Sequence, residues 1–176
     1  MKKILLTALL ILGGFSAQAQ WGIKGGLNFA NLKGDSDGNL NVLTQFHIGA
    51  VYEISVIDPF SIQPELLYSV QGAKVKGTYG DDIKLNYFSV PVMAKIYLTD
   101  GFNIHGGPQF GMLLSESDSF SPYNSKTFDF GFAGGLEFFV TDGLFIQGRY
   151  YGGTNKISGN TDLKNTTVQL SLGYMF

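Results

Sequence analysis

Apolar and polar residues alternate along most of the chain beyond residue 20. Near the C-terminal end, Val168, Leu170 and Leu172 alternate with Gln169 and Ser171. An alternation with a period of two residues places successive side chains on opposite faces of a β-strand. The same pattern recurs upstream, so the sequence predicts eight strands, at residues 23–29, 45–55, 60–71, 88–97, 102–112, 128–138, 144–151 and 167–176.

The predicted strands are long, and their connections alternate in length. Strands of soluble proteins average about 5–6 residues, whereas a strand that crosses a membrane needs about 9–11, as most of these have. Short connections are predicted at Ile57-Asp58-Pro59, Thr99-Asp100-Gly101 and Thr141-Asp142-Gly143, and longer ones at 31–44, 72–83, 115–126 and 154–164. Short turns at one end and long loops at the other are typical of outer-membrane barrels. The predicted fold class is therefore an all-β, transmembrane, antiparallel up-and-down β-barrel of about eight strands.

The alternation alone fits two opposite arrangements of the faces. A soluble barrel of the lipocalin kind keeps its apolar face inside, around a ligand, whereas a membrane barrel turns that face outward against lipid. The polar face of this chain is rich in small residues, including Gly49, Gly107, Gly131 and Gly135, which suit the crowded interior of a narrow barrel. The other face carries large aromatic and aliphatic side chains, which would cause aggregation in water. We therefore expect the apolar face to contact lipid.

The N-terminal segment has the features of a secretory signal. Two lysines precede an apolar run at residues 4–15, which is followed by Ala17-Gln18-Ala19. The run is too short to span a bilayer, and the small-x-small motif marks a cleavage site. We expect residues 1–19 to be a signal peptide that is cleaved before Gln20. Residues 20–176 would then form a single barrel domain in the cell outer membrane.

Composition and charge restrict the partners of the protein. The formal net charge is −2, and removal of Lys2 and Lys3 with the signal peptide would make it −4, which gives no reason to expect a nucleic-acid partner. The chain has no cysteine, so neither disulfides nor a lipid-modified cysteine is expected. The expected partners are outer-membrane lipid and, during insertion, the barrel-assembly machinery. Tyr174 and Phe176, at the end of the last strand, are the predicted assembly signal, and a further envelope protein partner is left unidentified.

Six charged residues fall on the predicted inner face, three of each sign. They are Lys24, Glu53, Glu65, Lys95, Glu137 and Arg149. Charges enclosed in a narrow barrel must be paired, because an isolated buried charge is very costly. We expect a network of ion pairs that fills the lumen. The alternative is a polar permeation path or a proton relay.

Signatures of catalysis are absent from the sequence. It has no Gly-x-Ser-x-Gly elbow, no phosphate-binding loop and no metal-spaced cluster of histidines. No catalytic, cofactor-binding or metal-binding residue is therefore predicted, and the protein is not expected to be an enzyme. His47 and His105 lie on the predicted inner face as hydrogen-bond partners, with a Ser–His pair acting on lipid as the alternative. The segment 35–39 lacks the closing glutamate of a calcium loop and is predicted to be a solvated turn.

Three stretches of the chain resemble the PorT-like outer-membrane β-barrel domain of Bacteroidota. They are Trp21-Gly22-Ile23-Lys24-Gly25-Gly26-Leu27-Asn28, Gln63-Pro64-Glu65-Leu66-Leu67-Tyr68-Ser69 and Tyr87-Phe88-Ser89-Val90-Pro91-Val92-Met93-Ala94-Lys95. The resemblance implies a small outer-membrane barrel across essentially the whole mature chain. It leaves three roles open. They are a structural or surface-interaction protein with loops displayed outside the cell, an accessory component of an envelope secretion or transport system, and a narrow passive pore.

Overall fold

Eight long strands and one short strand make up the fold. The computed structural model describes residues 19–34, 40–75, 82–117, 126–157 and 162–176, so all but one residue of the predicted signal peptide, and the segment 35–39, lie outside the described residues. The long strands are β1 (Ala19–Lys33), β3 (Leu43–Ile57), β4 (Phe60–Val75), β5 (Ile83–Thr99), β6 (Phe102–Glu116), β7 (Phe128–Phe139), β8 (Leu144–Gly153) and β9 (Lys164–Met175). The short strand β2 (Leu40–Asn41) pairs with the end of β4.

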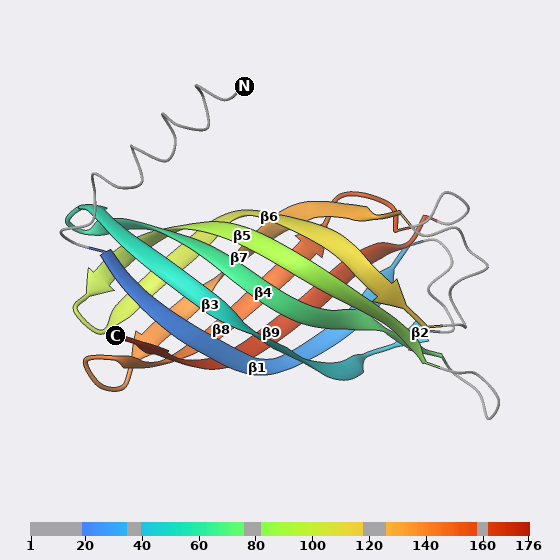
Figure 1. The fold of residues 1–176 in the computed structure, drawn as a ribbon, viewed down its shortest axis with the longest axis horizontal. Coiled ribbons are helices and arrows are strands. Elements are labelled where there is room, and N and C mark those ends of the chain that lie inside the picture. The colour runs from blue at the N-terminus through green and yellow to red at the C-terminus, as the bar shows by residue number, and fades with distance from the viewer. Residues whose placement is uncertain (1–18, 35–39, 76–81, 118–125, 158–161) are drawn as a thin grey trace, which may run out of the picture.

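The long strands form a closed antiparallel barrel. Each pairs with the long strands before and after it in the chain, and β9 pairs with β1 to close the ring (Figure 1). The predicted turns at Asp58-Pro59, at Asp100-Gly101 and at residues 140–143 join strands at one end, which we call the turn end. The other end, where the longer connections lie, is the loop end. The predicted fold class is confirmed. No helix among the described residues is long and apolar enough to cross a membrane.

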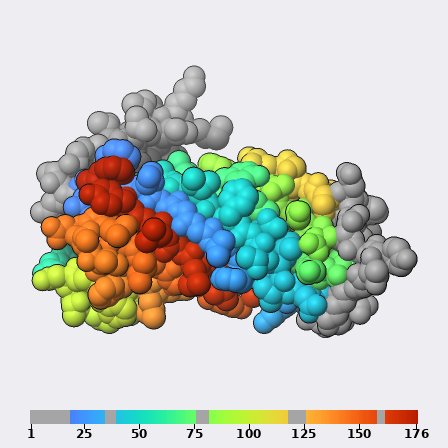
Figure 2. All heavy atoms as spheres, turned by 90° about the horizontal axis from the view of Figure 1, so that it is seen from below, coloured from blue at the N-terminus to red at the C-terminus, as the bar shows by residue number. Residues whose placement is uncertain are grey.

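The outer face of the barrel is apolar, as predicted. Along β9 the side chains of Val168, Leu170 and Leu172 are exposed, while the residues between them are buried in the lumen. The same alternation holds on the other long strands, which cross the surface as oblique bands (Figure 2). An exposed apolar surface that encircles a barrel is stable in lipid and unstable in water. The lipocalin-like alternative, with an apolar interior and a polar exterior, is therefore wrong.

The strands are longer at the loop end than the sequence predicted. β1 was expected to end at residue 29 but continues to Lys33, and β5 begins five residues before the expected position. In these extensions the polarity of the two faces is inverted. Leu32 and Leu85 point inward and are fully buried, whereas Lys33 and Lys84 are exposed. A polar outside and an apolar inside are typical of a barrel in water, so the strands project beyond the lipid at this end.

The inverted region encloses an apolar cluster that we call the loop-end cap. It consists of Leu32, Ala73, Ile83, Leu85, Tyr87, Ile157 and Leu163, with Leu40, Val75 and Leu113 packed against it. Ile157 and Leu163 come from the connection between β8 and β9, where Ile157 N–H donates to the Leu163 carbonyl. These two residues of the connection therefore point inward and contribute side chains to the lumen.

Two inward-facing glycines make room for large neighbouring side chains. A Cβ at Gly173 would lie 2.7 Å from Phe145 Cε1, and one at Gly131 would lie 2.7 Å from Tyr151 Cε2. Real Cβ atoms do not approach so closely, so these positions require glycine. The small residues that the sequence placed on the inner face thus let the aromatic rings fill a narrow lumen.

Candidate functional site

The six charged residues of the predicted network all lie inside the barrel. Lys24 is on β1, Glu53 on β3, Glu65 on β4, Lys95 on β5, Glu137 on β7 and Arg149 on β8. Each is at most 6% exposed. Strand alternation explains this placement, because each lies on the inward-facing set of positions of its strand. Six of the eight long strands thereby contribute one charge each to the same enclosed space.

Glu65 is the centre of the first group of charges. Its carboxylate accepts two hydrogen bonds from the Arg149 guanidinium, at 2.7 and 2.8 Å, and lies 2.8 Å from Lys24 Nζ. The bidentate contact with arginine is the strongest geometry for a carboxylate–guanidinium pair. With two cations and one anion, this group has a formal charge of +1.

Lys95 is the centre of the second group. Its Nζ lies 2.6 Å from Glu53 Oε2 and 2.5 Å from Glu137 Oε1. Tyr97 Oη donates a further hydrogen bond to Glu53, at 2.6 Å. With one cation and two anions, this group has a formal charge of −1, so the two groups together are neutral.

Two buried glutamines connect the groups. Gln63 donates to Glu65 at 2.8 Å and accepts from Lys95 at 3.0 Å. Gln147 accepts from Lys24 at 2.9 Å and donates to Glu137 at 2.7 Å. Each amide thus places its oxygen against a cation and its nitrogen against an anion. The sequence predicted the six charges but not the glutamines, since uncharged polar residues on an inner face carry no distinguishing signal.

The two histidines occupy separate positions in the lumen. His47 contacts Asn28 Oδ1 and Ser171 Oγ, both at 2.8 Å, and His105 Nε2 accepts from Arg149 Nε at 3.3 Å. A hydrolytic triad would need a carboxylate to orient the imidazole and an exposed serine. His47 has an amide in that place, and Ser171 is buried inside the barrel. His47 and Ser171 are therefore hydrogen-bond partners in the lumen, which is the role predicted for the histidines.

A polar layer that sequence reasoning missed lies between the charges and the loop-end cap. Asp129 Oδ2 accepts from Asn165 Nδ2 at 2.8 Å and from Tyr151 Oη at 3.0 Å. Asn165 Nδ2 also donates to Tyr87 Oη at 3.1 Å. Asp129 could have been found as a seventh charge on the inner face of its strand. No cluster of three or more His, Cys, Asp or Glu side chains in the described ranges could hold a metal ion.

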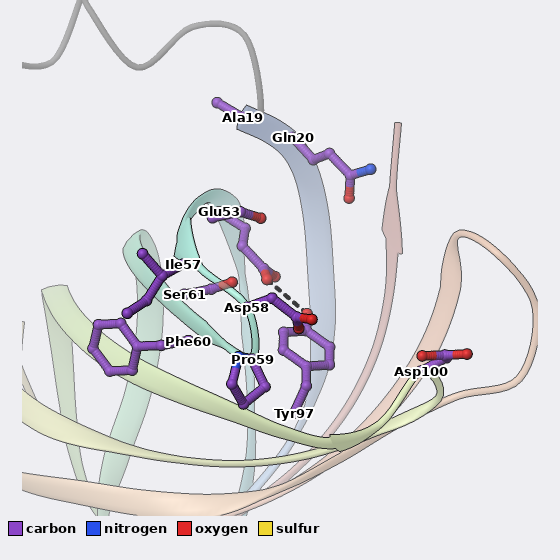
Figure 3. A pocket seen from close by; sticks show the side chains of 11 residues that line it. Ala19, Gln20, Glu53, Ile57, Asp58, Pro59, Phe60, Ser61, Tyr97 and Asp100 are labelled. Atoms are coloured by element: carbon purple, nitrogen blue, oxygen red, sulfur yellow. Dashed lines mark hydrogen bonds between the residues drawn. The ribbon is translucent and has the colours of Figure 1, made fainter.

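The turn end of the barrel opens into a wide mouth of about 710 Å³. Figure 3 shows its lining, with Asp58 and Asp100 at the rim and the Glu53–Tyr97 hydrogen bond at its inner side. Because Glu53 also pairs with Lys95, the mouth ends at the second group of charges.

Tyr174 and Phe176, the predicted assembly signal, lie on the outer surface at the turn end. The Phe176 ring stacks on that of Trp21, with centroids 4.2 Å apart, and forms a T-shaped contact with the Tyr174 ring, with centroids 5.2 Å apart. Phe176 N–H also donates to the Trp21 carbonyl at 2.8 Å. These contacts join the two ends of the described barrel at the β1–β9 seam. Recognition by the assembly machinery stays a prediction.

Comparison with known proteins places the chain among outer-membrane barrels. The family described as "Outer membrane protein beta-barrel domain" matches residues 5–176. No curated protein matches the chain in sequence.

Several solved structures share the fold. The attachment invasion locus protein Ail of Yersinia pestis is 17% identical with a TM-score of 0.57, and the match covers 90% of this chain and 99% of that one. Neisserial surface protein A is 12% identical with a TM-score of 0.61, at 90% and 99% coverage. OprG from Pseudomonas aeruginosa is 13% identical with a TM-score of 0.51, at 90% and 96% coverage. At such identities the likeness establishes the shared fold.

Proposed function

Because the chain belongs to the outer membrane protein β-barrel domain family, we propose that it acts as a closed barrel that presents its long loops at the cell surface. The protein is a small outer-membrane barrel with an apolar outer face. Its lumen determines which of the three roles left open by the sequence fits best.

The observation that carries the proposal is the double closure of the lumen. The charged network joins six strands by direct contacts of 2.5–2.8 Å. Beyond it, the loop-end cap places Leu32, Leu85 and Ile157 across the other end of the barrel. An ion crossing the barrel would have to separate buried ion pairs and then enter an apolar cluster, and both steps are costly. The narrow pore is therefore disfavoured.

The accessory role in secretion or transport has less support. The described residues form one continuous barrel wall, and no feature of them favours a docked envelope partner over free loops. The names of the attachment invasion locus protein and of neisserial surface protein A refer to attachment and to the surface, and both share this fold. These likenesses support a surface role for the loops.

Three finer assignments belong to the same proposal. We infer that residues 1–19 are cleaved, which would remove Ala19, the first residue of β1, and leave Gln20 as the N-terminal residue of that strand at the turn end. We assign the chain to the PorT-like group within the family, on the three stretches that resemble it. We also infer that Tyr174 and Phe176 engage the assembly machinery, since an exposed aromatic pair closes the last strand.

Epitope insertion in whole cells tests the surface role. A tag inserted after Asn155, in an exposed part of the β8–β9 connection, should be labelled by antibody on intact cells. The matched control is the same tag after Asp142, in the turn between β7 and β8, which should be labelled only after the outer membrane is opened. Labelling of the Asp142 tag alone on intact cells would reverse the proposed orientation. Labelling of neither would contradict surface display.

A further inference from the structure

Exposed lysines surround the loop end of the barrel. Five of them lie on or next to strand ends, namely Lys33, Lys74, Lys84, Lys126 and Lys164. The opposite rim differs in charge, because the three short turns expose Asp58, Asp100 and Asp142 and contain no lysine or arginine. Lysines at the loop end stand beside acidic residues such as Asp82 and Asp162, whereas the aspartates of the short turns have no basic residue in their turns.

Lys33 and Lys164 lie at the same height above the apolar band. Lys33 is four residues beyond Phe29 on β1, and Lys164 is four residues beyond Val168 on β9, each on the outward-facing set of positions. Four residues at about 3.3 Å each, on a strand tilted by about 35–45°, rise about 9–11 Å. The headgroup layer extends about 5–8 Å beyond the hydrocarbon, and a lysine side chain is long enough to reach back into it from this height.

Lys33 and Lys164 are direct partners across the β1–β9 pairing. Side chains in this relation have Cβ atoms about 4.5–5.5 Å apart, and like charges there are destabilising. Neither lysine forms an ion pair with a described residue. Asp162 forms an ion pair with Lys156 and is also influenced by Lys164. Among the described residues of this group, three lysines therefore share one carboxylate.

We propose that Lys33 and Lys164 bind a phosphate group of a phosphorylated lipid in the outer leaflet. Two ammonium groups side by side match the charge of one phosphate, and binding removes their mutual repulsion. Below the pair, the outer face is formed first by the polar Asn31 and Thr166 and then by Phe29 and Val168, so the acyl chains of the same lipid would lie on the apolar band. This continuity favours a lipid over a free anion. The inference rests on the proposed orientation, with the loop end in the outer leaflet.

Lipid retention by the mature barrel in neutral detergent tests this inference. The probes are diphosphorylated lipid A and the same lipid with its phosphates removed, and the readout is the bound fraction in native mass spectrometry. We expect retention of the phosphorylated lipid alone. A lysine near a headgroup surface contributes about 1 kcal/mol, so Lys33→Gln or Lys164→Gln should weaken binding about 5-fold and the double variant about 30-fold. Lys156→Gln, the matched control, removes an exposed lysine that already has a carboxylate partner and should change binding less than about 2-fold.

The unfolding temperature of the barrel provides a second readout, and the double variant should change it in opposite directions without and with phosphorylated lipid. Without lipid, the double variant should unfold at a higher temperature than the wild type, because the repulsion is gone. With phosphorylated lipid, the order should reverse. Equal retention of both lipids, or equal retention by the double variant and the wild type, would overturn the inference. Displacement of the lipid by millimolar inorganic phosphate would show a site for free anions and reject a lipid site. Inverted labelling in the epitope experiment, with normal lipid retention here, would affect only the proposed orientation.

Discussion

Neutralising Glu65 should remove more stability than any other single change in the lumen. Glu65 is 1% exposed, and its carboxylate is the only anion in contact with Lys24 and Arg149 in the described structure. In Glu65→Gln, two cations would remain buried beside a neutral amide. Removal of one partner of a buried ion pair costs about 3–5 kcal/mol. We expect a loss of that size in the free energy of unfolding.

The assay is urea unfolding of the barrel in phospholipid vesicles, followed by the fluorescence of Trp21, the only tryptophan. Gel mobility of unheated and boiled samples would report the folded fraction independently. A cycle with Arg149→Gln and the double variant isolates the contact from other effects of each change. The double variant removes one charge of each sign. Its loss in free energy of unfolding should therefore be clearly smaller than the sum of the losses of the two single variants.

Glu53→Gln provides a comparison within the same network. Glu53 lies at the mouth and is 6% exposed. When it is neutralised, Lys95 still has an ion-pair partner in Glu137. Its loss should therefore be smaller than that of Glu65→Gln. If Glu65→Gln changed the free energy of unfolding by less than about 1 kcal/mol, as for an exposed ion pair, the inference that the network excludes water and stabilises the barrel would be refuted.

Three further predictions concern the wall of the barrel. Leu170→Arg, on the outer face of β9, should cost about 2–4 kcal/mol in vesicles, whereas Thr166→Arg, nearer the loop end of the same face, should cost about 0–1, and equal losses would contradict the depth assigned to the two positions in the lipid. Gly173→Ala should cost about 1–3 kcal/mol through contact with Phe145, partly restored by Phe145→Leu. Gly148→Ala, whose Cβ would make only an ordinary contact with Leu170 Cδ2 at 3.9 Å, should be neutral in urea unfolding. Phe176→Ala should lose about 0.5–1.5 kcal/mol of stacking on Trp21 and lower the amount in the outer-membrane fraction, and an unchanged amount would count against the assembly signal.

The sequence predicted the wall of the barrel because alternation is a local property. The side chain of Leu170 faces lipid and that of Gln169 faces the lumen whatever the distant strands do. The same rule placed all six charges inside. It could not say which pairs form, because Arg149 and Glu65 are 84 residues apart and meet only across the closed barrel. Pairing depends on the register of several strands at once.

The loop end was predicted poorly for a physical reason. Beyond Phe29 the inward positions of β1 become apolar and the outward positions polar, so a fixed assignment of faces ends the strand too early. Ile157 was predicted as part of the long connection at 154–164, yet it is 3% exposed within the cap. A single apolar residue between polar neighbours has no periodicity, and only the folded barrel shows what it packs against.

Planar-bilayer recording of the wild-type barrel would show whether the lumen is closed. Insertion of folded protein would be confirmed by its heat-dependent gel mobility before recording. We expect no steady conductance, because the charged network and the loop-end cap both close the lumen. Stable single-channel steps that change with Lys95→Gln would contradict it and restore the narrow pore.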